Sequence, residues 1–183
     1  MRKVVYWVHT SVDGFIAGPN GEFDWAAMGP ELSAYSDTLT ERVDTFLYGR
    51  VVWELMAGYW PTADRLSDHP HDLSFAKVWR RMPKVVFSRT LTEAGWGARV
   101  SADVESEVRA LRDQPGKDLV LTGGAGLAAT LAGLNLIDEY QVVVHPVVLG
   151  GGKQVFPFAA RFDLELADTR TFDGRAVLLS YRR

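Results

Sequence analysis

Four small residues in a row, Gly123-Gly124-Ala125-Gly126, separate an apolar β-branched run from a run of small helix-forming residues. Glycine lets a backbone come close to a bulky anion, and the first turn of a helix offers free N–H groups at the positive end of its dipole. The segment therefore suits a diphosphate. The alternative is a glycine turn needed only for tight packing of a helix on a strand.

The same loop matches the G-x-G-x-x-A spacing of dinucleotide-binding folds through Gly124, Gly126 and Ala129. That arrangement calls for an acidic residue roughly 20 positions later, at the end of the next strand. The stretch 142–149 (VVVHPVVL) contains none. We therefore keep the phosphate-binding interpretation and reject the standard Rossmann arrangement.

Two other strand ends carry groups suited to anions. Arg50 follows Gly49 at the expected start of a helix, where a cation is unfavourable unless an anion is bound or a neighbouring carboxylate pairs with it. Ser88 and Arg89 follow the strand KVVF and suit a phosphate ester, although they also suit an ordinary polar loop. Together the three loops predict one site with two phosphate centres, which indicates NADP rather than NAD.

Hydride reduction also needs a proton from an acid or an ordered water. Asp13 is a candidate, although a residue before Gly14 also suits a turn cap. Asp24, beside Trp25, is a second candidate, since a carboxylate and an aromatic ring suit a heterocycle; its alternative is a cap for a short helix. Asp37, on the first expected helix, is the third.

Other titratable residues are weaker candidates. His145, before Pro146 in an apolar strand, is typical of a core histidine, and Glu139 is typical of a solvated charge. His69 and His71 lie in a polar loop, and such close neighbours in a loop make a poor metal cage. We expect no metal site.

Composition excludes several classes of protein. The 183 residues are 47% hydrophobic and 23% charged, the balance of one globular domain. There is no cysteine, which excludes disulfides, thiolate metal sites and a cysteine nucleophile. The net charge of −3 disfavours nucleic acid as a partner. No apolar run approaches the roughly 20 residues of a membrane span, and no signal peptide is evident, so we expect a cytoplasmic protein.

Strands and helices alternate along most of the chain, and a hairpin at Asp173-Gly174 closes it. This pattern predicts an α/β sandwich with a mainly parallel sheet and an antiparallel edge, in which ligands lie beyond the carboxyl ends of the strands. We expect strands at 4–9, 44–48, 84–87, 118–122, 139–148, 163–171 and 175–181, helices at 31–43, 50–57, 103–112 and 125–134, and a surface loop at 61–72.

Five ordered motifs carry a resemblance to a known family. They are SVDGFIA (11–17), LYGRVVWELM (47–56), KVVFSRTL (84–91), LTGGAGLAATL (121–131) and LIDEYQVVVHPVVLGGGKQVF (136–156). The chain resembles the dihydrofolate-reductase-like superfamily and, within it, the C-terminal reductase domain of the bifunctional riboflavin-biosynthesis deaminase/reductase. The resemblance implies one domain over 1–183, a three-layer sandwich with a twisted mixed sheet of about eight strands, NADPH across the carboxyl edge, and a homodimer.

The resemblance also implies roles for individual residues. Val52 departs from related reductases, which commonly carry a threonine whose hydroxyl binds phosphate, and Ser33 matches the pterin-binding carboxylate position as well as Asp37 does. By position the cofactor-binding residues are Thr10, Ile16, Ala17, Gly49, Arg50, Val52, Ser88, Arg89, Gly123, Gly124, Ala125, Gly126 and Leu127.

The expected function is an NADPH-dependent reductase of a small heterocyclic substrate, resembling 5-amino-6-(5-phosphoribosylamino)uracil reductase. Two alternatives stay open: a dihydrofolate reductase, and a non-catalytic module that uses the same fold to bind a nucleotide or to dimerise.

Overall fold

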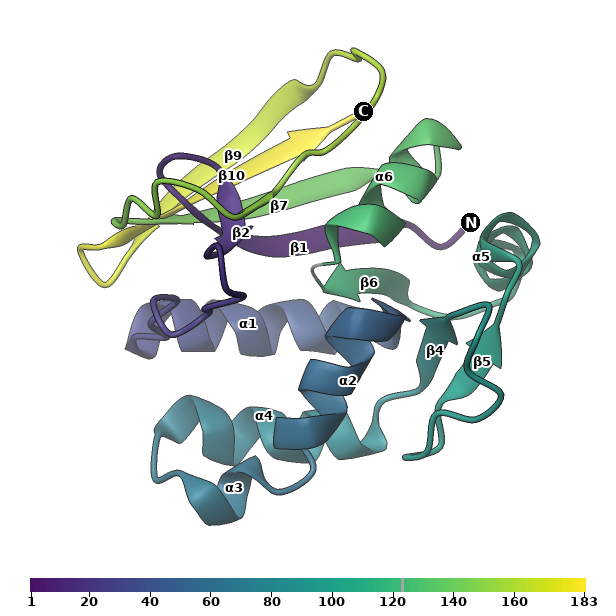
Figure 1. Cartoon of the computed structure of the whole chain (residues 1–183), viewed down its shortest axis with the longest axis horizontal. Coiled ribbons are helices and arrows are strands. Elements are labelled where there is room, and N and C mark those ends of the chain that lie inside the picture. Colours follow the sequence, from purple (N-terminus) through teal and green to yellow (C-terminus); the bar gives the residue numbers. More distant parts are fainter. Residues whose placement is uncertain (123) are drawn as a thin grey trace.

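The computed structural model describes residues 1–122 and 124–183, which form an eight-stranded sheet flanked by helices (Figure 1). The strand order is β5-β4-β3-β6-β1-β7-β10-β9. Every pair from β5 to β7 is parallel, and β10 runs antiparallel to both of its neighbours, which confirms the expected edge. The strands are β1 (Val4–Ser11), β3 (Val43–Gly49), β4 (Lys84–Phe87), β5 (Arg99–Ser101), β6 (Asp118–Thr122), β7 (Glu139–His145), β9 (Glu165–Phe172) and β10 (Ala176–Arg182). A separate two-stranded sheet pairs β2 (Phe15–Ala17) with β8 (Lys153–Gln154).

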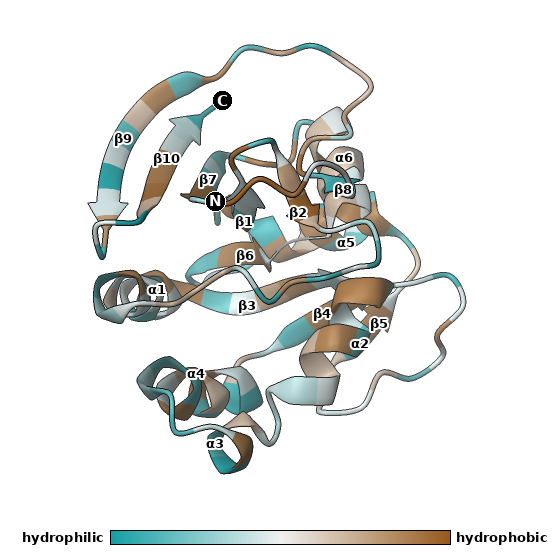
Figure 2. Ribbon diagram, turned by 60° about the vertical axis from the view of Figure 1, so that its left-hand side comes forward, coloured by the Kyte–Doolittle hydropathy of each residue, from teal (hydrophilic) through white to brown (hydrophobic). Residues whose placement is uncertain are grey.

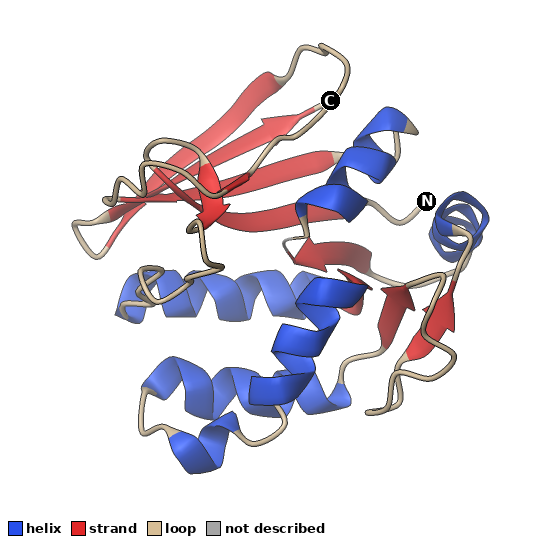
Figure 3. Cartoon of the chain, viewed as in Figure 1, coloured by secondary structure: helices blue, strands red, loops and turns tan. Residues whose placement is uncertain are grey.

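Helices cover both faces of the sheet, so the described part of the chain has three layers (Figure 3). The helices are α1 (Pro30–Arg42), α2 (Arg50–Tyr59), α3 (Ala63–Leu66), α4 (Pro70–Arg81), α5 (Val104–Asp113) and α6 (Ala125–Gly133). Buried side chains of α1, α2 and α4 pack in one core, and those of α5 and α6 pack in the other. In Figure 2, β9 and β10 run at a steep angle to β3, as the twist of a sheet requires.

β1 shows why the sequence folds in this way. Its aromatic and β-branched side chains alternate between the two cores: Val5 and Trp7 pack on the side of α1, while Val4, Tyr6 and Val8 pack on the side of α6. All five are buried, which confirms a strand covered on both faces.

The crossover connections change direction beside β1, which makes this the topological switch point of the sheet. The crossover from β1 through α1 leads to β3, toward the β5 end of the sheet, whereas the crossover from β6 through α6 leads to β7, toward the β9 end. Right-handed crossovers in opposite directions place their helices on opposite faces. The carboxyl ends of β3, β6 and β1 therefore lie side by side where a ligand crevice is expected.

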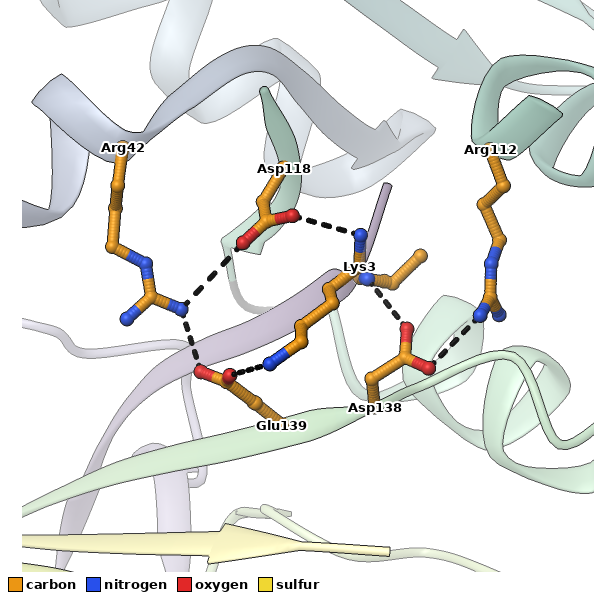
Figure 4. A network of polar contacts seen from close by, with 7 residues as sticks. Lys3, Arg42, Arg112, Asp118, Asp138 and Glu139 are labelled. Atoms are coloured by element: carbon orange, nitrogen blue, oxygen red, sulfur yellow. Dashed lines mark hydrogen bonds and ion pairs between the residues drawn. The ribbon is translucent and has the colours of Figure 1, made fainter. Parts of the chain in front are cut away.

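Charged side chains tie the strands together at the opposite, amino edge (Figure 4). Glu139 pairs with Arg42 at 2.6 Å and with Lys3 at 3.0 Å, while Arg112 pairs with Asp138 at 2.9 Å. Burial alone would raise the pKa of Glu139, but the hydrogen bonds from Arg42 and Lys3 hold it below its ordinary value. Glu139 is thus a paired structural carboxylate and not the solvated charge that its sequence context suggested.

The closing hairpin reaches back to the first helix. Asp173 and Gly174 have φ values of 55° and 61°, as the expected Asp-Gly turn requires. The Asp173 carboxylate accepts hydrogen bonds from the backbone N–H groups of Glu31 and Leu32, at 2.9 and 3.2 Å. α1 has no side-chain cap of its own, so the hairpin supplies it.

Two expectations about the elements were wrong. The expected surface loop at 61–72 contains α3 and the first turn of α4, and α4 as a whole was missed. Its buried face carries Phe75 and Trp79, but Pro70 and two histidines near its start gave the sequence the composition of a loop. The strand expected over 139–148 ends at His145, just before Pro146. Within the described residues no helix is long and apolar enough to cross a membrane.

Candidate functional site at the carboxyl edge

The loops that follow β3, β4 and β6 converge at the carboxyl edge. A side chain built on Gly49 would lie 3.7 Å from Cβ of Leu127, and one built on Gly124 would lie 3.4 Å from Cγ2 of Val52. Gly49 pairs in register with Phe87, so Ser88 and Arg89 leave the sheet next to the start of α2. The three loops singled out from the sequence therefore form one continuous surface.

Two helices begin on this surface without side-chain caps. Gly49 is the N-cap of α2 and Gly124 that of α6, and neither start receives a side-chain hydrogen bond. The unpaired N–H groups and the dipoles of both helices thus point at the same region. Gly124 has a φ of +74° and lies against Val52, so any side chain there would be both strained and crowded. Ala125 is buried behind it, and Gly123 lies outside the described residues.

Of the polar side chains of these loops, Arg50 and Arg89 are exposed and Ser88 is half-buried. Arg50 pairs with Glu54 one turn along α2 at 2.9 Å, with each side chain about half exposed. The Ser88 hydroxyl accepts hydrogen bonds from the N–H groups of Thr90 and Leu91, and it lies 3.3 Å from the Thr90 hydroxyl. Arg89 is exposed and makes no ion pair with any described residue. The surface therefore holds two guanidinium groups beside two helix starts.

The segment after β1 is held over the same edge. Thr10 is buried, and its hydroxyl donates to carbonyls of Ser11 and Phe15. Ile16 and Ala17 are half-buried in β2, and Gly152, at a φ of +125°, lies so close that a side chain would overlap the Ala17 carbonyl. This packing fixes the position of the residues that the sequence places beside a nicotinamide.

Asp13 ties this segment to the loop after β7. Its two carboxylate oxygens accept the N–H groups of Leu149 and Gly150 at 3.1 and 2.7 Å. A hydrogen bond from Ser11, together with these backbone bonds, outweighs the effect of desolvation and holds the pKa of Asp13 below its ordinary value. An ionised carboxylate with both oxygens engaged is better suited to positioning the loop than to donating a proton.

The other two carboxylate candidates do not meet Asp13. Asp24 is exposed in the segment 18–29, which has no helix, so the alternative of a helix cap was wrong. Asp37 lies on α1 toward α4, where its charge raises the pKa of His71, although burial lowers that pKa more strongly. The structure therefore does not bring the three proposed acids together.

Two histidines from neighbouring strands contact each other near the carboxyl ends of β1 and β7. Nδ1 of His9 on β1 lies 2.8 Å from Nε2 of His145 on β7, and their rings are stacked with centroids 5.1 Å apart. The ring of Trp25 meets His145 edge-on at 5.7 Å, and that of Phe23 meets His9 at 6.4 Å. The sequence analysis interpreted His145 as a core residue and did not single out His9. Because His9 pairs in register with Val143, two residues before His145, both side chains lie on the same face of the sheet. The alternation of side chains along the two strands was therefore the signal that could have found the pair.

Burial lowers the pKa of both imidazoles. The pKa of His9 falls to about 3, through burial first and then through the charges that His145 and His71 would carry. The pKa of His145 falls to about 4, through burial first and then through Arg175. Both rings are therefore neutral near pH 7, and their contact is a hydrogen bond between neutral imidazoles.

His145 lines a cavity of about 580 Å³ on the α1 side of the sheet. Its wall includes residues 26–29 of the segment after β2, the start of α4 with His69 and Asp72, and Arg175 from the hairpin. This volume lies within the range of roughly 300–1,000 Å³ typical of small-molecule sites. Since Ser11 pairs in register with His145, the cavity adjoins the segment expected beside a nicotinamide.

A larger cavity of about 710 Å³ opens at the amino edge. Four of its five lining cations already have partners. Lys84 donates to the Met82 carbonyl at 2.7 Å and Lys117 to the Glu41 carbonyl at 2.6 Å, both near helix C-termini, while Arg2 pairs with Asp44 and Arg99 with Glu107. Because these contacts explain the cations structurally, we place the candidate site at the carboxyl edge.

The strand order and the two helix starts at the carboxyl edge define an α/β protein of the dihydrofolate-reductase-like type. The RibD C-terminal domain model matches residues 2–178. The chain belongs to the RibD C-terminal domain family.

Known proteins similar to this chain span its whole length. The Bacillus subtilis protein YyaP is 37% identical over 98% of this chain and 94% of its own, and YwjB from the same organism is 30% identical over 100% and 98%.

Solved structures share the fold at lower identity. A putative riboflavin biosynthesis protein from Shewanella sp. PV-4 superimposes with a TM-score of 0.77 at 22% identity, covering 100% of this chain and 99% of its own. A Thermotoga maritima diaminohydroxyphosphoribosylaminopyrimidine deaminase/5-amino-6-(5-phosphoribosylamino)uracil reductase gives 0.68 at 16%, covering 99% and 56%. Enterococcus faecalis dihydrofolate reductase, complexed with NADP(H) and RAB-propyl, gives 0.64 at 15%, covering 99% and 96%.

Proposed function

We propose that this protein is an NADPH-dependent reductase of a small heterocyclic substrate. The observation that carries the proposal is the convergence of the loops after β3, β4 and β6, with the starts of α2 and α6 in contact at Gly49, Val52 and Gly124. The names of the solved relatives, a deaminase/reductase and a dihydrofolate reductase complexed with NADP(H), point to the same chemistry.

The residues present fit a dinucleotide with three phosphates. The uncapped N–H groups at residues 50–52 and 124–127 suit the diphosphate, and Arg50, Ser88 and Arg89 suit the additional phosphate that distinguishes NADPH from NADH. Thr10, Ile16 and Ala17 lie beside the expected nicotinamide position. When bound, NADPH supplies the hydride; this chain orients the ring, excludes water and provides the path for a proton.

The cavity beside His145 is the proposed place for the substrate. It adjoins the segment after β1, and the ring of Trp25 packs against His145, which lines the cavity. Dihydrofolate is the weaker alternative, because Asp37 faces α4 and does not line the cavity. A non-catalytic nucleotide-binding module would need no such cavity.

Calorimetric titration with NADPH and NADH tests the proposal. We expect NADPH to bind at least about tenfold more tightly than NADH, since one charge-assisted contact is worth roughly 1.5–3 kcal/mol. Arg50→Gln and Arg89→Gln should remove most of that preference. No heat of binding at millimolar NADPH would refute the cofactor assignment.

A matched pair of glycine variants separates cofactor binding from folding. Gly126 and Gly58 are both exposed, and a side chain on either would meet no atom within 4 Å. Gly126→Asp places a negative charge at the start of α6, which the helix dipole favours but a bound diphosphate opposes. We expect it to fold normally and to lose NADPH affinity, whereas Gly58→Asp, with the same charge near the far end of α2, should bind as the wild type does.

We further propose that the protein acts as a cytoplasmic homodimer. β9 is an edge strand whose residues 165–171 are exposed, and long exposed edges are usually covered. A molar mass of one chain by light scattering at micromolar concentration would refute the dimer.

A further inference from the structure

The His9–His145 pair has the features of a functional group rather than of core packing. Core histidines usually satisfy their nitrogens with backbone or carboxylate partners, but here each ring is the other's partner at 2.8 Å. Neither imidazole ring makes a second hydrogen bond with the described residues. Two polar rings, His145 buried and His9 half-buried, are thus kept together at a ligand cavity, where apolar side chains would have cost less free energy.

The geometry determines which nitrogen of each ring is engaged between the two histidines and which is left over. Nε2 of His145 is occupied by Nδ1 of His9, so Nδ1 is the nitrogen that His145 can present to the cavity it lines. Nε2 of His9 is the nitrogen left at the other end, on a ring that is only partly buried. A single hydrogen bond therefore joins the cavity-lining ring of His145 to the partly exposed ring of His9, which lies beside Phe23.

We propose that His145 contacts the ring that is reduced and passes it the proton, and that His9 is the positioning residue that sets the tautomer of His145; this inference rests on the proposed reductase function. With a proton on Nδ1 of each ring, His9 donates to His145, and His145 can donate to the substrate.

The proton transfer balances. Hydride addition to a C=N bond leaves a nitrogen anion that is far more basic than imidazole. The Nδ1 proton of His145 moves to that nitrogen, the Nδ1 proton of His9 moves to Nε2 of His145, and Nε2 of His9 takes a proton from water. After the transfer both imidazoles are neutral and carry their proton on Nε2. The protons return to Nδ1 of each ring before the next cycle.

The surroundings favour a neutral relay. Arg175 from the hairpin faces His145 and opposes its protonation, and His71 on α4 does the same for His9. The two carboxylates that line the cavity are engaged elsewhere: Asp72 accepts from the Tyr59 hydroxyl at 2.9 Å, and Asp173 caps α1. Trp25 and Phe23 cover the pair from the segment after β2.

Long-range ¹H–¹⁵N spectra of the histidine rings test the tautomer without any cofactor. At pH 7 we expect both rings to be neutral and His145 to carry its proton on Nδ1. His9→Asn keeps an amide that can donate at a similar position and should preserve this tautomer, whereas His9→Val should shift His145 toward protonation at Nε2. A cationic ring, or a His145 spectrum that ignores His9→Val, would overturn the inference.

The probe 5,6-diaminouracil then tests contact with the ring. We expect it to shift the His145 Nδ1 resonance, to bind about tenfold more weakly to His145→Phe for the loss of one hydrogen bond, and to bind normally to His71→Asn, which also removes a buried imidazole. Absence of binding, or equal binding to His145→Phe, would overturn the assignment. NADPH binding, measured on the same variants, tests the proposed function separately. If NADPH binds normally but the probe does not bind as expected, only the histidine assignment is overturned.

Discussion

The neutral histidine pair makes the protein sensitive to mild acid. Both rings have a pKa near 6.5 in the unfolded chain and lower values in the folded protein, about 3 for His9 and about 4 for His145. The unfolded state therefore binds more protons below pH 6.5, and stability must fall as pH falls from about 7 toward 4.

The size of the loss follows from these values. Between pH 7 and pH 5, a histidine whose pKa falls from 6.5 to 4 or lower loses about 2 kcal/mol of its contribution to the free energy of unfolding, so the pair loses about 4 kcal/mol. Carboxylates with a lowered pKa, such as Asp64 and Asp103, act mainly below pH 5, because their protonation in the unfolded chain begins there. The window from pH 7 to 5 thus reports on histidine.

Urea unfolding at pH 7, 6 and 5 measures this loss. The wild type should lose at least about 4 kcal/mol across the window, because His71, whose pKa burial also lowers, adds to the loss from the pair. His145→Asn should lose about 2 kcal/mol less than the wild type, since one titrating group is gone. The m-value should stay constant. A wild-type stability that is flat from pH 7 to 5, or an identical slope in His145→Asn, would show that the pair is not held neutral in the folded protein.

Three further predictions concern the same edge and its supports. Val52→Thr adds a hydroxyl at the start of α2 and should tighten NADPH binding by about 0.5–1.5 kcal/mol, measured by calorimetry against the exposed neighbour Val51→Thr, which should change nothing. Gly152→Ala forces a side chain into the Ala17 carbonyl at a positive φ and should lower thermal stability by more than about 1 kcal/mol; an unchanged melting temperature would contradict that contact. Asp173→Ala removes the cap of α1 and should cost about 1–2 kcal/mol in urea unfolding, whereas Asp173→Asn should recover part of it.

Much of the fold was predictable because its signals are local. Strand β1 is apolar on both faces, and the turn at Asp173 carries its own chemistry, so composition alone located both. The sequence analysis did not predict α4, because Pro70 and the neighbouring histidines are typical of a loop. The burial of this helix depends on Trp79, which packs with residues distant in the sequence. Propensity carries no information about such tertiary contacts.

The candidate site divides in the same way. The glycine and arginine loops follow strand ends and could be located from spacing, because parallel strands bring their carboxyl ends to one edge. The contact of His9 with His145 joins residues 136 positions apart, and only the pairing of β1 with β7 brings them together. For Arg50 the sequence left open a bound anion or a neighbouring carboxylate, and the described residues show the carboxylate pairing, with Glu54 four residues along the helix.

The central position of β1 also bears on how the chain acquires its structure during synthesis. β1 leaves the ribosome first, but its two sheet neighbours, β6 and β7, begin at residues 118 and 139. At roughly 5–20 residues per second, this apolar strand waits about 5 to 25 seconds for its partners. A nascent chain stalled before residue 118 would expose Val4 to Val8 without a neighbouring strand. We therefore expect this segment to depend on chaperones for protection during synthesis. We also expect the sheet to form late and cooperatively, once β6 and β7 are available.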